Sequence, residues 1–475
     1  MIKKADCKQK SRLASPERGG AERSEAEGFG QQTDLNFLQK QVCKNSMELM
    51  FNKQPAMNVE NHFFMKGRVS MRRVVITGLG AVTPVGNDVE TMWDSMKNGV
   101  CGIDIITRYD PSLTKAKVAA EVKNFEPTKY IEKRECRKLD LFCQYALAAS
   151  AQAVEDSDII GKIEPERLGV YIGSGVGGII TFYEQCENMF NDKNISPFFI
   201  PMMIANIASG NVAIKYNAKG PSLPVVTACA TSTHAVGEAF HAIKYSFADA
   251  IIAGGSEAAV HPLTIKGFTS CKALTMSDDP KNASIPFDKR RNGFVLGEGA
   301  GILVLEEYEH SVARGAKIYA EICGYGNTCD AHHITAPAPD SSGSSKCIQI
   351  ALEEAGYKGD EELYINAHGT STPMNDSTET KAFKIALGEK AYKAHISSTK
   401  SMTGHMLGAT GAVEAIAATL ALKEGIVPPT IGYAEPDPEC DLDYTPNKAV
   451  KAELDMALST TFGFGGHNAC IVLRK

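Results

Sequence analysis

The chain has 475 residues, of which 43% are hydrophobic and 22% charged, and this composition is typical of a globular protein with a large core. Its net charge of -6 argues against nucleic acid as a main partner. No apolar run approaches the roughly 20 residues that span a bilayer, and no apolar stretch of a signal peptide follows the charged N-terminus, so we expect no membrane segment. The 13 cysteines are scattered without a C-x-x-C pair, which argues against a disulfide framework or a metal site and favours the reducing cytoplasm.

The first 70 residues differ in composition from the rest. The run PERGGAERSEAEGFGQQ is polar and rich in glycine, so it cannot bury enough apolar surface to offset its ordering entropy. Residues 35–64 contain scattered apolar positions that could form a weak helix. We interpret residues 1–70 as a disordered extension, or as the result of a wrongly chosen start codon, because Met71 opens directly onto a predicted strand. A targeting or partner-binding tail is the functional alternative.

Between residues 71 and 320, short apolar runs alternate with helical patterns. RRVVITGLG is a β-branched run that ends in glycines, which indicates a buried strand. The other predicted strands are 168–175, 224–230, 248–258 and the start of 299–315, and the predicted helices are 140–155, 234–247 and the end of 299–315. This alternation predicts an α/β fold with buried, largely parallel sheets.

A similar order of elements returns after about residue 318. AEICGYG resembles VVITGLG, and the small-residue helix GAVEAIAATLALKEG resembles HAVGEAFHAIKYSF. The predicted strands here are 320–326, 362–369, 457–466 and 468–475, and the predicted helices are 344–356 and 411–425. We therefore predict two related halves, 71–320 and 321–475.

Four segments carry residue types suited to chemistry. In PVVTACATSTHAVGEA, Cys229 stands between a predicted strand and a helix, where the free N–H groups of the helix favour a thiolate. The alternative is a small buried hydrophobic residue. In ELYINAHGTSTPMND, His368 follows a buried strand, and Thr370 and Thr372 place hydroxyls at alternating positions for an extended ligand. A loop histidine with capping threonines is the alternative.

The other two segments follow in the C-terminal half. In HISSTKSMTGHMLGATGAVEAI, Lys400 and His405 flank a polar turn, and Glu414 is the nearest anionic partner for the lysine. The alternative is a salt-bridged helix cap. In FGFGG, residues 462–466, Phe464 lies in a flexible loop that can present backbone N–H groups. An ordinary glycine turn is the alternative there.

Taken in order and spacing, these segments resemble the β-ketoacyl-[acyl-carrier-protein] synthases, and within them the synthase II type. The resemblance runs from about Arg72 to the C-terminus and rests on TACA, GFVLGEGAG, NAHGTSTP, STKSMTGH and FGFGG. It implies the thiolase fold, with two duplicated halves in a five-layer α-β-α-β-α sandwich, and a homodimer. It also implies decarboxylative condensation of an acyl-enzyme with malonyl-carrier protein, and we expect neither a cofactor nor a metal ion.

The resemblance also implies roles for individual residues. Cys229 matches the acyl-accepting nucleophile, His368 and His405 match the histidine pair, and Phe464 matches the gating phenylalanine. Lys400 and Glu414 match a lysine and its acidic partner. The backbone N–H groups of Cys229 and Phe464 match the oxyanion hole. The positions that match acyl-pocket contacts are Val176, Phe199 and Phe268. The positions that match pantetheine contacts are Thr370 and Thr372. The positions that match a basic patch for the acidic acyl carrier protein are Arg134, Arg137, Lys138 and Lys272.

Two residues depart from the family pattern, and one motif suggests another class. Ser232 stands where glycine is frequent, and His467 stands where threonine is common after GFGG. Val176 is smaller than the usual aliphatic residue, which leaves the chain-length preference open. Gly173 to Gly178 fits G-x-G-x-x-G, with Asp192 at a distance suited to a ribose contact, and this pattern would indicate an NAD-dependent oxidoreductase. A non-catalytic partner subunit, a polyketide ketosynthase and a thiolase are the further alternatives.

Overall fold

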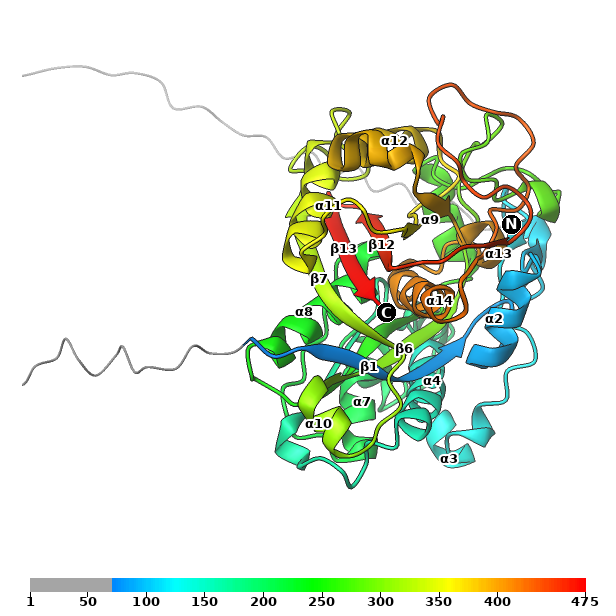
Figure 1. Ribbon diagram of the computed structural model, residues 1–475. Coiled ribbons are helices and arrows are strands. Elements are labelled where there is room, and N and C mark those ends of the chain that lie inside the picture. Colours follow the sequence, from blue (N-terminus) through cyan, green and yellow to red (C-terminus); the bar gives the residue numbers. More distant parts are fainter. Residues whose placement is uncertain (1–70) are drawn as a thin grey trace, which may run out of the picture. The chain divides into compact units, whose positions relative to one another are not determined.

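The computed structural model describes residues 71–475 (Figure 1). The expectations for residues 1–70, including the weak helix over 35–64, lie outside this range. In the first half the elements are β1 (Val74–Val82), α2 (Val89–Lys97), β2 (Asp104–Ile105), β3 (Val118–Ala119), α3 (Lys133–Cys136), α4 (Leu141–Ser157), β4 (Leu168–Gly173), α5 (Ile179–Phe190), α6 (Phe199–Met203), α7 (Ile207–Tyr216), α8 (Thr231–Lys244), β5 (Ala250–Glu257), α9 (Pro262–Ser270), β6 (Gly299–Glu307) and α10 (Tyr308–Ala313). In the second half they are β7 (Ala320–Cys329), α11 (Ser342–Ala355), β8 (Leu363–Asn366), α12 (Pro373–Leu387), β9 (His395–Ser397), α13 (Lys400–Thr403), α14 (Thr410–Glu424), β10 (Ile426–Val427), β11 (Val450–Lys451), β12 (Met456–Gly463) and β13 (His467–Arg474).

The main sheet contains the same strand pattern twice. Its order is β4-β5-β6-β1-β7-β13-β12-β8-β9. In the first half β4 pairs with β5 in parallel, and β6 runs antiparallel to β5 and β1. In the second half β8 pairs with β12 in parallel, and β13 runs antiparallel to β12 and β7. The two sets join where Val74–Ile76 of β1 pairs with Ala320–Ile322 of β7. The matched order and direction give this fold the internal repeat that the sequence echoes predict.

The expectation of largely parallel sheets is wrong. Only β4–β5, β8–β12 and β8–β9 are parallel pairs in the main sheet. The turn Phe464–Gly466 connects β12 directly to β13, and so short a connection forces the two strands to run antiparallel. A fully buried strand has a continuous apolar run whether its neighbours are parallel or antiparallel. The apolar pattern alone therefore could not predict the direction of the strands.

Paired glycines explain why VVITGLG and AEICGYG resemble each other. A Cβ on Gly80 of β1 would lie 1.9 Å from the carbonyl oxygen of Ala149 in α4. A Cβ on Gly326 of β7 would lie 1.9 Å from the carbonyl oxygen of Cys347 in α11. At both equivalent positions, glycine lets an outer helix approach the sheet backbone more closely than any side chain would permit.

Gly326→Ala is therefore expected to lower the free energy of unfolding by about 3 kcal/mol or more, because the new methyl group meets backbone that cannot move aside. The matched control is Gly267→Ala in α9, where an added Cβ meets nothing within 4 Å. This control is expected to be neutral or stabilising by up to about 1 kcal/mol, through helix propensity. Urea denaturation of both variants measures the difference, and equal stabilities would contradict the close-packing argument.

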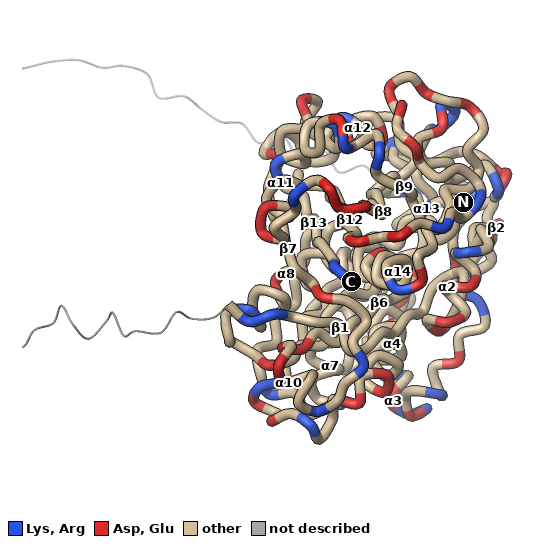
Figure 2. Tube along the Cα trace, viewed as in Figure 1, with Lys and Arg blue, Asp and Glu red and all other residues tan. Residues whose placement is uncertain are grey.

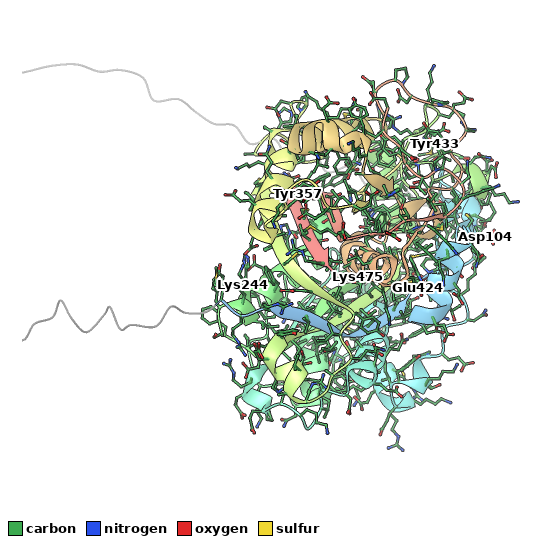
Figure 3. The ribbon with its side chains drawn as sticks, viewed as in Figure 1. Asp104, Lys244, Tyr357, Glu424, Tyr433 and Lys475 are labelled. Atoms are coloured by element: carbon green, nitrogen blue, oxygen red, sulfur yellow. The ribbon has the colours of Figure 1, made fainter. Side chains whose placement is uncertain are left out.

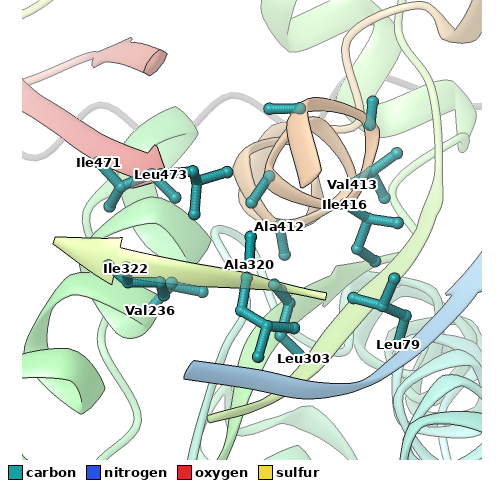
Figure 4. Packing of buried hydrophobic residues seen from close by; sticks show 14 of the residues in the cluster. Leu79, Val236, Leu303, Ala320, Ile322, Ala412, Val413, Ile416, Ile471 and Leu473 are labelled. Atoms are coloured by element: carbon teal, nitrogen blue, oxygen red, sulfur yellow. The ribbon is translucent and has the colours of Figure 1, made fainter. Parts of the chain in front are cut away.

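Helices cover both faces of the two strand sets and also fill the space between them. The central helices α8 and α14 each pack on strands of both halves, with a core that includes Val236, Ile416 and Ile471 (Figure 4). On the outer faces, α4 and α7 cover the first set, while α11 covers the second set and α12 packs beside it. The resulting layers are helix, sheet, helix, sheet and helix, which is the arrangement of the thiolase fold.

Charged groups also connect the two halves. Lys244, at the end of α8, binds Glu354 of α11 with an N–O distance of 2.6 Å, and His241 binds the same carboxylate at 3.0 Å (Figure 3 labels Lys244). These contacts lower the pKa of Glu354 to about 2 against the opposing effect of burial. Within residues 71–475, no helix is both long and apolar enough to cross a membrane.

Candidate active site

Cys229 lies in a tight turn directly before α8. It is the central residue of the 3-10 turn Ala228–Ala230, and its side chain is buried. The strand predicted over 224–230 is not formed, because Ala228 has a φ of +51°, a left-handed conformation that strands do not contain. The cysteine does precede a helix, as the sequence predicts, but a strained turn replaces the strand before it.

The electrostatic environment of Cys229 contains opposing contributions. Burial raises the pKa of the Cys229 thiol to about 12, whereas the Lys400 ammonium and the Phe464 backbone N–H lower it. The net direction is opposite to the thiolate stabilisation expected from the helix N-terminus, because desolvation outweighs the favourable dipole and charge. Burial therefore favours the neutral thiol of Cys229 over the thiolate.

His368 and His405 form a buried pair. His368 follows β8, His405 follows α13, and their ring centroids are 5.3 Å apart at an interplanar angle of 87°. Burial and the nearby Lys400 hold the pKa of both rings well below the usual histidine value, so both are neutral. Among the described residues, Nδ1 of His368 and Nε2 of His405 have no hydrogen-bond partner. Each neutral ring carries one N–H donor and one acceptor nitrogen.

Lys400 and Glu414 form an ion pair in the core next to these histidines. Each side chain is 1% exposed, and Lys400 Nζ donates to Glu414 Oε1. Burial raises the pKa of Glu414 to about 7, and the Lys400 charge opposes the shift. Lys400 thus brings a positive charge near Cys229 and both rings, and it adds to the effect of burial in lowering the pKa values of the histidines.

A cavity of about 320 Å³ brings most of the predicted site residues together. Its walls include Cys229, both histidines, Phe464, Thr370, Thr372 and Lys272. The Thr370 and Thr372 hydroxyls are 2.9 Å apart, and Thr372 also caps α12. Most of the lining is apolar, with a few polar groups that converge near Cys229. The cavity therefore suits an extended chain that reaches Cys229.

The three predicted acyl-pocket residues do not line this cavity. Phe268 lies just behind it, 5.4 Å from Phe294 and 6.4 Å from Phe464 between ring centroids. Val176 is 39% exposed, and Phe199 is half-buried at the start of α6 beside Phe182. In the single chain, Val176 and Phe199 thus belong to an outer face, and their contact with an acyl chain stays a prediction.

The predicted carrier-binding residues are divided between two places. Arg134, Arg137 and Lys138 lie in and just after α3, whereas Lys272 lines the cavity. Lys138 pairs with Glu135 at 2.7 Å and lies over the ring of Phe198. Basic and acidic residues alternate along the visible trace (Figure 2), so any attraction for an acidic partner must be local.

Sequence reasoning missed Glu379, a fully buried carboxylate on α12. It accepts hydrogen bonds from the backbone N–H groups of His368 and Gly369, both at 2.7 Å, and from the Thr460 hydroxyl at 3.0 Å. Burial raises the pKa of Glu379 to about 7. Within the run NDSTET, Glu379 looks like any polar residue on a helix. The only sequence signal was its place as an acidic residue in the element that follows His368.

The raised pKa of Glu379 predicts a pH-dependent stability. The folded chain keeps this proton up to about pH 7, while the unfolded chain releases it near 4.5, so ionisation lowers the free energy of unfolding as pH rises between these values. Glu379→Gln removes this dependence. The stability of the variant relative to wild type is expected to rise by up to about 3 kcal/mol between pH 5 and pH 8, measured by urea denaturation. Parallel profiles would contradict the assignment, and the exposed Glu389→Gln is the control.

The structure argues against the dinucleotide-binding alternative. The loop after β4 would have to offer its N–H groups to a pyrophosphate. Instead, the N–H groups of Gly175 and Val176 donate to the buried carboxylate of Glu257, at 2.8 and 3.2 Å. Asp192 lies in a loop after α5, not at the end of a strand. The glycines therefore serve close packing, and Glu257 is a second buried acid that sequence reasoning missed.

The two departures from the family pattern lie beside the site. Ser232, on α8, accepts a hydrogen bond from the N–H of Ala412 at 2.9 Å and so helps α8 and α14 to pack. His467 begins β13, and its ring centroid is 6.3 Å from that of His234. Neither residue lines the cavity.

Comparisons with known proteins agree with the geometry. The β-ketoacyl synthase N-terminal domain matches residues 71–311, and the C-terminal domain matches residues 319–434. The 3-oxoacyl-[acyl-carrier-protein] synthase 2 of Synechocystis sp. is 50% identical over 409 residues, which cover 85% of this chain and 98% of that protein. A β-ketoacyl synthase from Burkholderia phymatum has a TM-score of 0.79 at 33% identity, over 85% of this chain and all of that one.

A further structure contains a type II polyketide acyl-carrier protein in complex with its ketosynthase, bound to the hexaketide. Its TM-score is 0.78 at 36% identity, over 85% of this chain and 99% of that one. Fold and cavity together define an acyl-transferring condensing enzyme of the thiolase fold. The chain belongs to the β-ketoacyl synthase family, and the resemblance in its motifs is thereby confirmed.

Proposed function

We propose that the chain catalyses the decarboxylative condensation of an acyl-enzyme with malonyl-[acyl-carrier-protein], which gives 3-oxoacyl-[acyl-carrier-protein] and CO₂ in fatty acid elongation. The observation that carries the proposal is the cavity that joins Cys229 to two neutral histidines. The 50% identical relatives named 3-oxoacyl-[acyl-carrier-protein] synthase 2 support fatty acids over polyketides as the product class.

In the first half-reaction, the sulfur of Cys229 attacks the thioester carbonyl of an acyl-carrier protein. The proton of Cys229 leaves with the carrier thiol, and an acyl-enzyme remains. The backbone N–H groups of Cys229 and Phe464 hold the negative charge of the tetrahedral intermediate, and they cost no reorganisation because the turn and loop are preformed. Lys400 stabilises negative charge at the sulfur during the attack.

In the second half-reaction, malonyl-carrier protein enters, and its C–C bond to the carboxylate breaks. The electron pair forms an enolate on the thioester oxygen, which accepts hydrogen bonds from His368 and His405. Neutral rings suit this role because each donates one N–H without first losing a proton. The enolate carbon then attacks the acyl carbonyl, and collapse of the intermediate expels Cys229 as a thiolate, which takes up a proton from solvent to restore the neutral thiol. In this proposal residues 71–320 supply the nucleophile, while residues 321–475 supply the histidines and Lys400.

A homodimer is part of the proposal. The segment 222–226 lies at the edge of the main sheet beside β4, where Leu223 N–H donates to Val170. Large apolar side chains are exposed on this segment, on α5 and α6, and on the loops beside them. They are Val176, Phe182, Met189, Phe190, Phe198, Ile200, Leu223 and Val226. A second copy of the chain would cover this unpaired edge and apolar face, and with them Val176 and Phe199.

The remaining parts of the proposal concern environment and partner. The described residues contain eleven free cysteines, which suits the reducing cytoplasm. Acyl and malonyl forms of the acyl carrier protein are the proposed partners, and Arg134, Arg137, Lys138 and Lys272 are the proposed contacts.

The direct test supplies acyl-carrier proteins of several chain lengths with malonyl-carrier protein. We expect a 3-oxoacyl-carrier product by mass spectrometry and one CO₂ for each product. Light scattering is expected to give the mass of a dimer. A folded dimer that releases no product at any chain length would overturn the proposed reaction, and a monomer would overturn the proposed assembly.

A further inference from the structure

The turn that carries Cys229 needs support from outside itself. Ala228 is an L-residue with a left-handed φ of +51°, and such a conformation costs on the order of 1 kcal/mol or more unless its surroundings fix it. Two local hydrogen bonds close the turn, from Thr227 N–H to the Thr231 hydroxyl at 2.9 Å and from Ala230 N–H to the Thr227 carbonyl at 3.1 Å. These bonds close the turn but do not set its position relative to the second half of the chain.

His234 makes that connection. It lies on α8, five residues after Cys229, and its side chain is 3% exposed. Nδ1 of His234 is 2.7 Å from the hydroxyl oxygen of Thr227, at the start of the turn. Nε2 is 3.1 Å from Oδ1 of Asn327, on β7 of the second half. One imidazole thus bridges the nucleophile turn to a strand of the other half.

The chemistry of the bridge fixes the tautomer of His234. An amide oxygen only accepts hydrogen bonds, so Nε2 of His234 carries the proton that is donated to Asn327. Nδ1 is then an acceptor, and the Thr227 hydroxyl donates to it. Burial lowers the pKa of His234 to about 4, so the ring stays neutral and keeps this arrangement at physiological pH.

The position of the turn matters because the second half also supplies an oxyanion donor. A Cβ on Gly463 would lie 2.8 Å from the Thr227 carbonyl oxygen and 3.3 Å from the Cys229 nitrogen, so the loop before Phe464 packs directly on the turn. The two proposed oxyanion N–H groups therefore come from backbone segments whose spacing depends on this contact. An error of about 1 Å in such a geometry can cost on the order of a hundredfold in rate.

We infer that His234 is a positioning residue, whose neutral imidazole holds the Cys229 turn against β7 and so aligns the thiol with its oxyanion donors. The inference rests on the proposed role of Cys229 as the acyl acceptor. It assigns His234 to the acylation step and not to decarboxylation, which uses His368 and His405 on other elements.

The test compares two partial reactions of His234→Ala. We expect the rate of Cys229 acylation by acyl-carrier protein, followed by intact mass after rapid quenching, to fall 10-fold to 100-fold. CO₂ release from malonyl-carrier protein without an acyl donor is expected to stay within twofold of wild type. Thr227→Val is expected to match His234→Ala, and the double variant to lose little more, because both changes remove one shared contact.

Conservative and control variants separate positioning from folding. His234→Asn keeps an oxygen that can accept from Thr227, so it is expected to recover part of the acylation rate. His241→Ala, two turns along the same helix, removes a half-buried contact with Glu354 and is expected to leave acylation unchanged. Equal losses in acylation and decarboxylation, or a loss that follows thermal stability across all variants, would overturn the inference. Undiminished acylation in His234→Ala would also overturn it while leaving the proposed function intact. If wild-type protein forms no adduct, the role of Cys229 fails first.

Discussion

Replacing Cys229 with alanine is expected to abolish the acyl adduct and to lower condensation on the order of 10⁴-fold or more. Intact mass spectrometry after incubation with acyl-carrier protein should show one acyl group on the wild type and none on the variant. Addition of malonyl-carrier protein should discharge the wild-type adduct as a 3-oxoacyl product. The expectation follows because Cys229 is the buried cysteine of the cavity that also contains the two neutral histidines and the Phe464 loop, whereas Cys271 of the same cavity is exposed.

The controls address the other thiols. Cys101→Ala removes a half-buried cysteine that does not line the cavity, and this variant should be acylated like wild type. Cys229→Ser keeps the size of the side chain with a poorer nucleophile and should acylate far more slowly. If Cys229→Ala still formed the full adduct, another side chain would be the acyl acceptor. Cys271, an exposed cysteine that lines the same cavity, would be the first residue to examine.

The sequence could locate Cys229, His368, Lys400 and His405 because each lies where a regular element begins or ends. Such positions combine an interpretable apolar pattern with a polar break, and the family motifs mark them. The buried carboxylates Glu379 and Glu257 were missed for the opposite reason. An acidic residue on a helix or at a strand end resembles a solvated one, and only the fold reveals that backbone N–H groups surround it.

The errors in the fold have a similar origin. Strands 299–307 and 467–474 have the apolar runs of buried strands, and neither run encodes the direction of its neighbours. The segment 224–230 is apolar enough for a strand, but the backbone of Ala228 turns away, and no local residue preference indicates a left-handed alanine. The exposure of Val176 and Phe199 depends on whether a second chain covers them, which lies beyond any local pattern.

Removing either histidine of the pair is expected to stop the second half-reaction while sparing the first. His405→Ala and His368→Ala each remove one donor to the developing enolate, so CO₂ release from malonyl-carrier protein should fall about 10²-fold to 10³-fold. Acylation of Cys229 should continue, because its proposed oxyanion donors are backbone N–H groups of the turn and the Phe464 loop. An acyl adduct that accumulates without discharge is therefore the expected signature, and it is the reverse of the defect expected for His234→Ala.

An amide side chain is expected to replace part of the function of His405. His405 is held through Nδ1 by the Thr410 hydroxyl at 3.1 Å, which leaves Nε2 for the ligand. His405→Asn or His405→Gln retains an N–H donor and is expected to restore more decarboxylation than alanine does. His395→Ala, at a surface histidine bound to Glu362, is the control and should not change either half-reaction.

Because both rings are neutral with strongly lowered pKa values, wild-type decarboxylation should show no histidine titration between pH 6 and 8. A rate that falls as a single ring protonates within that range would contradict the lowered pKa values of the two histidines.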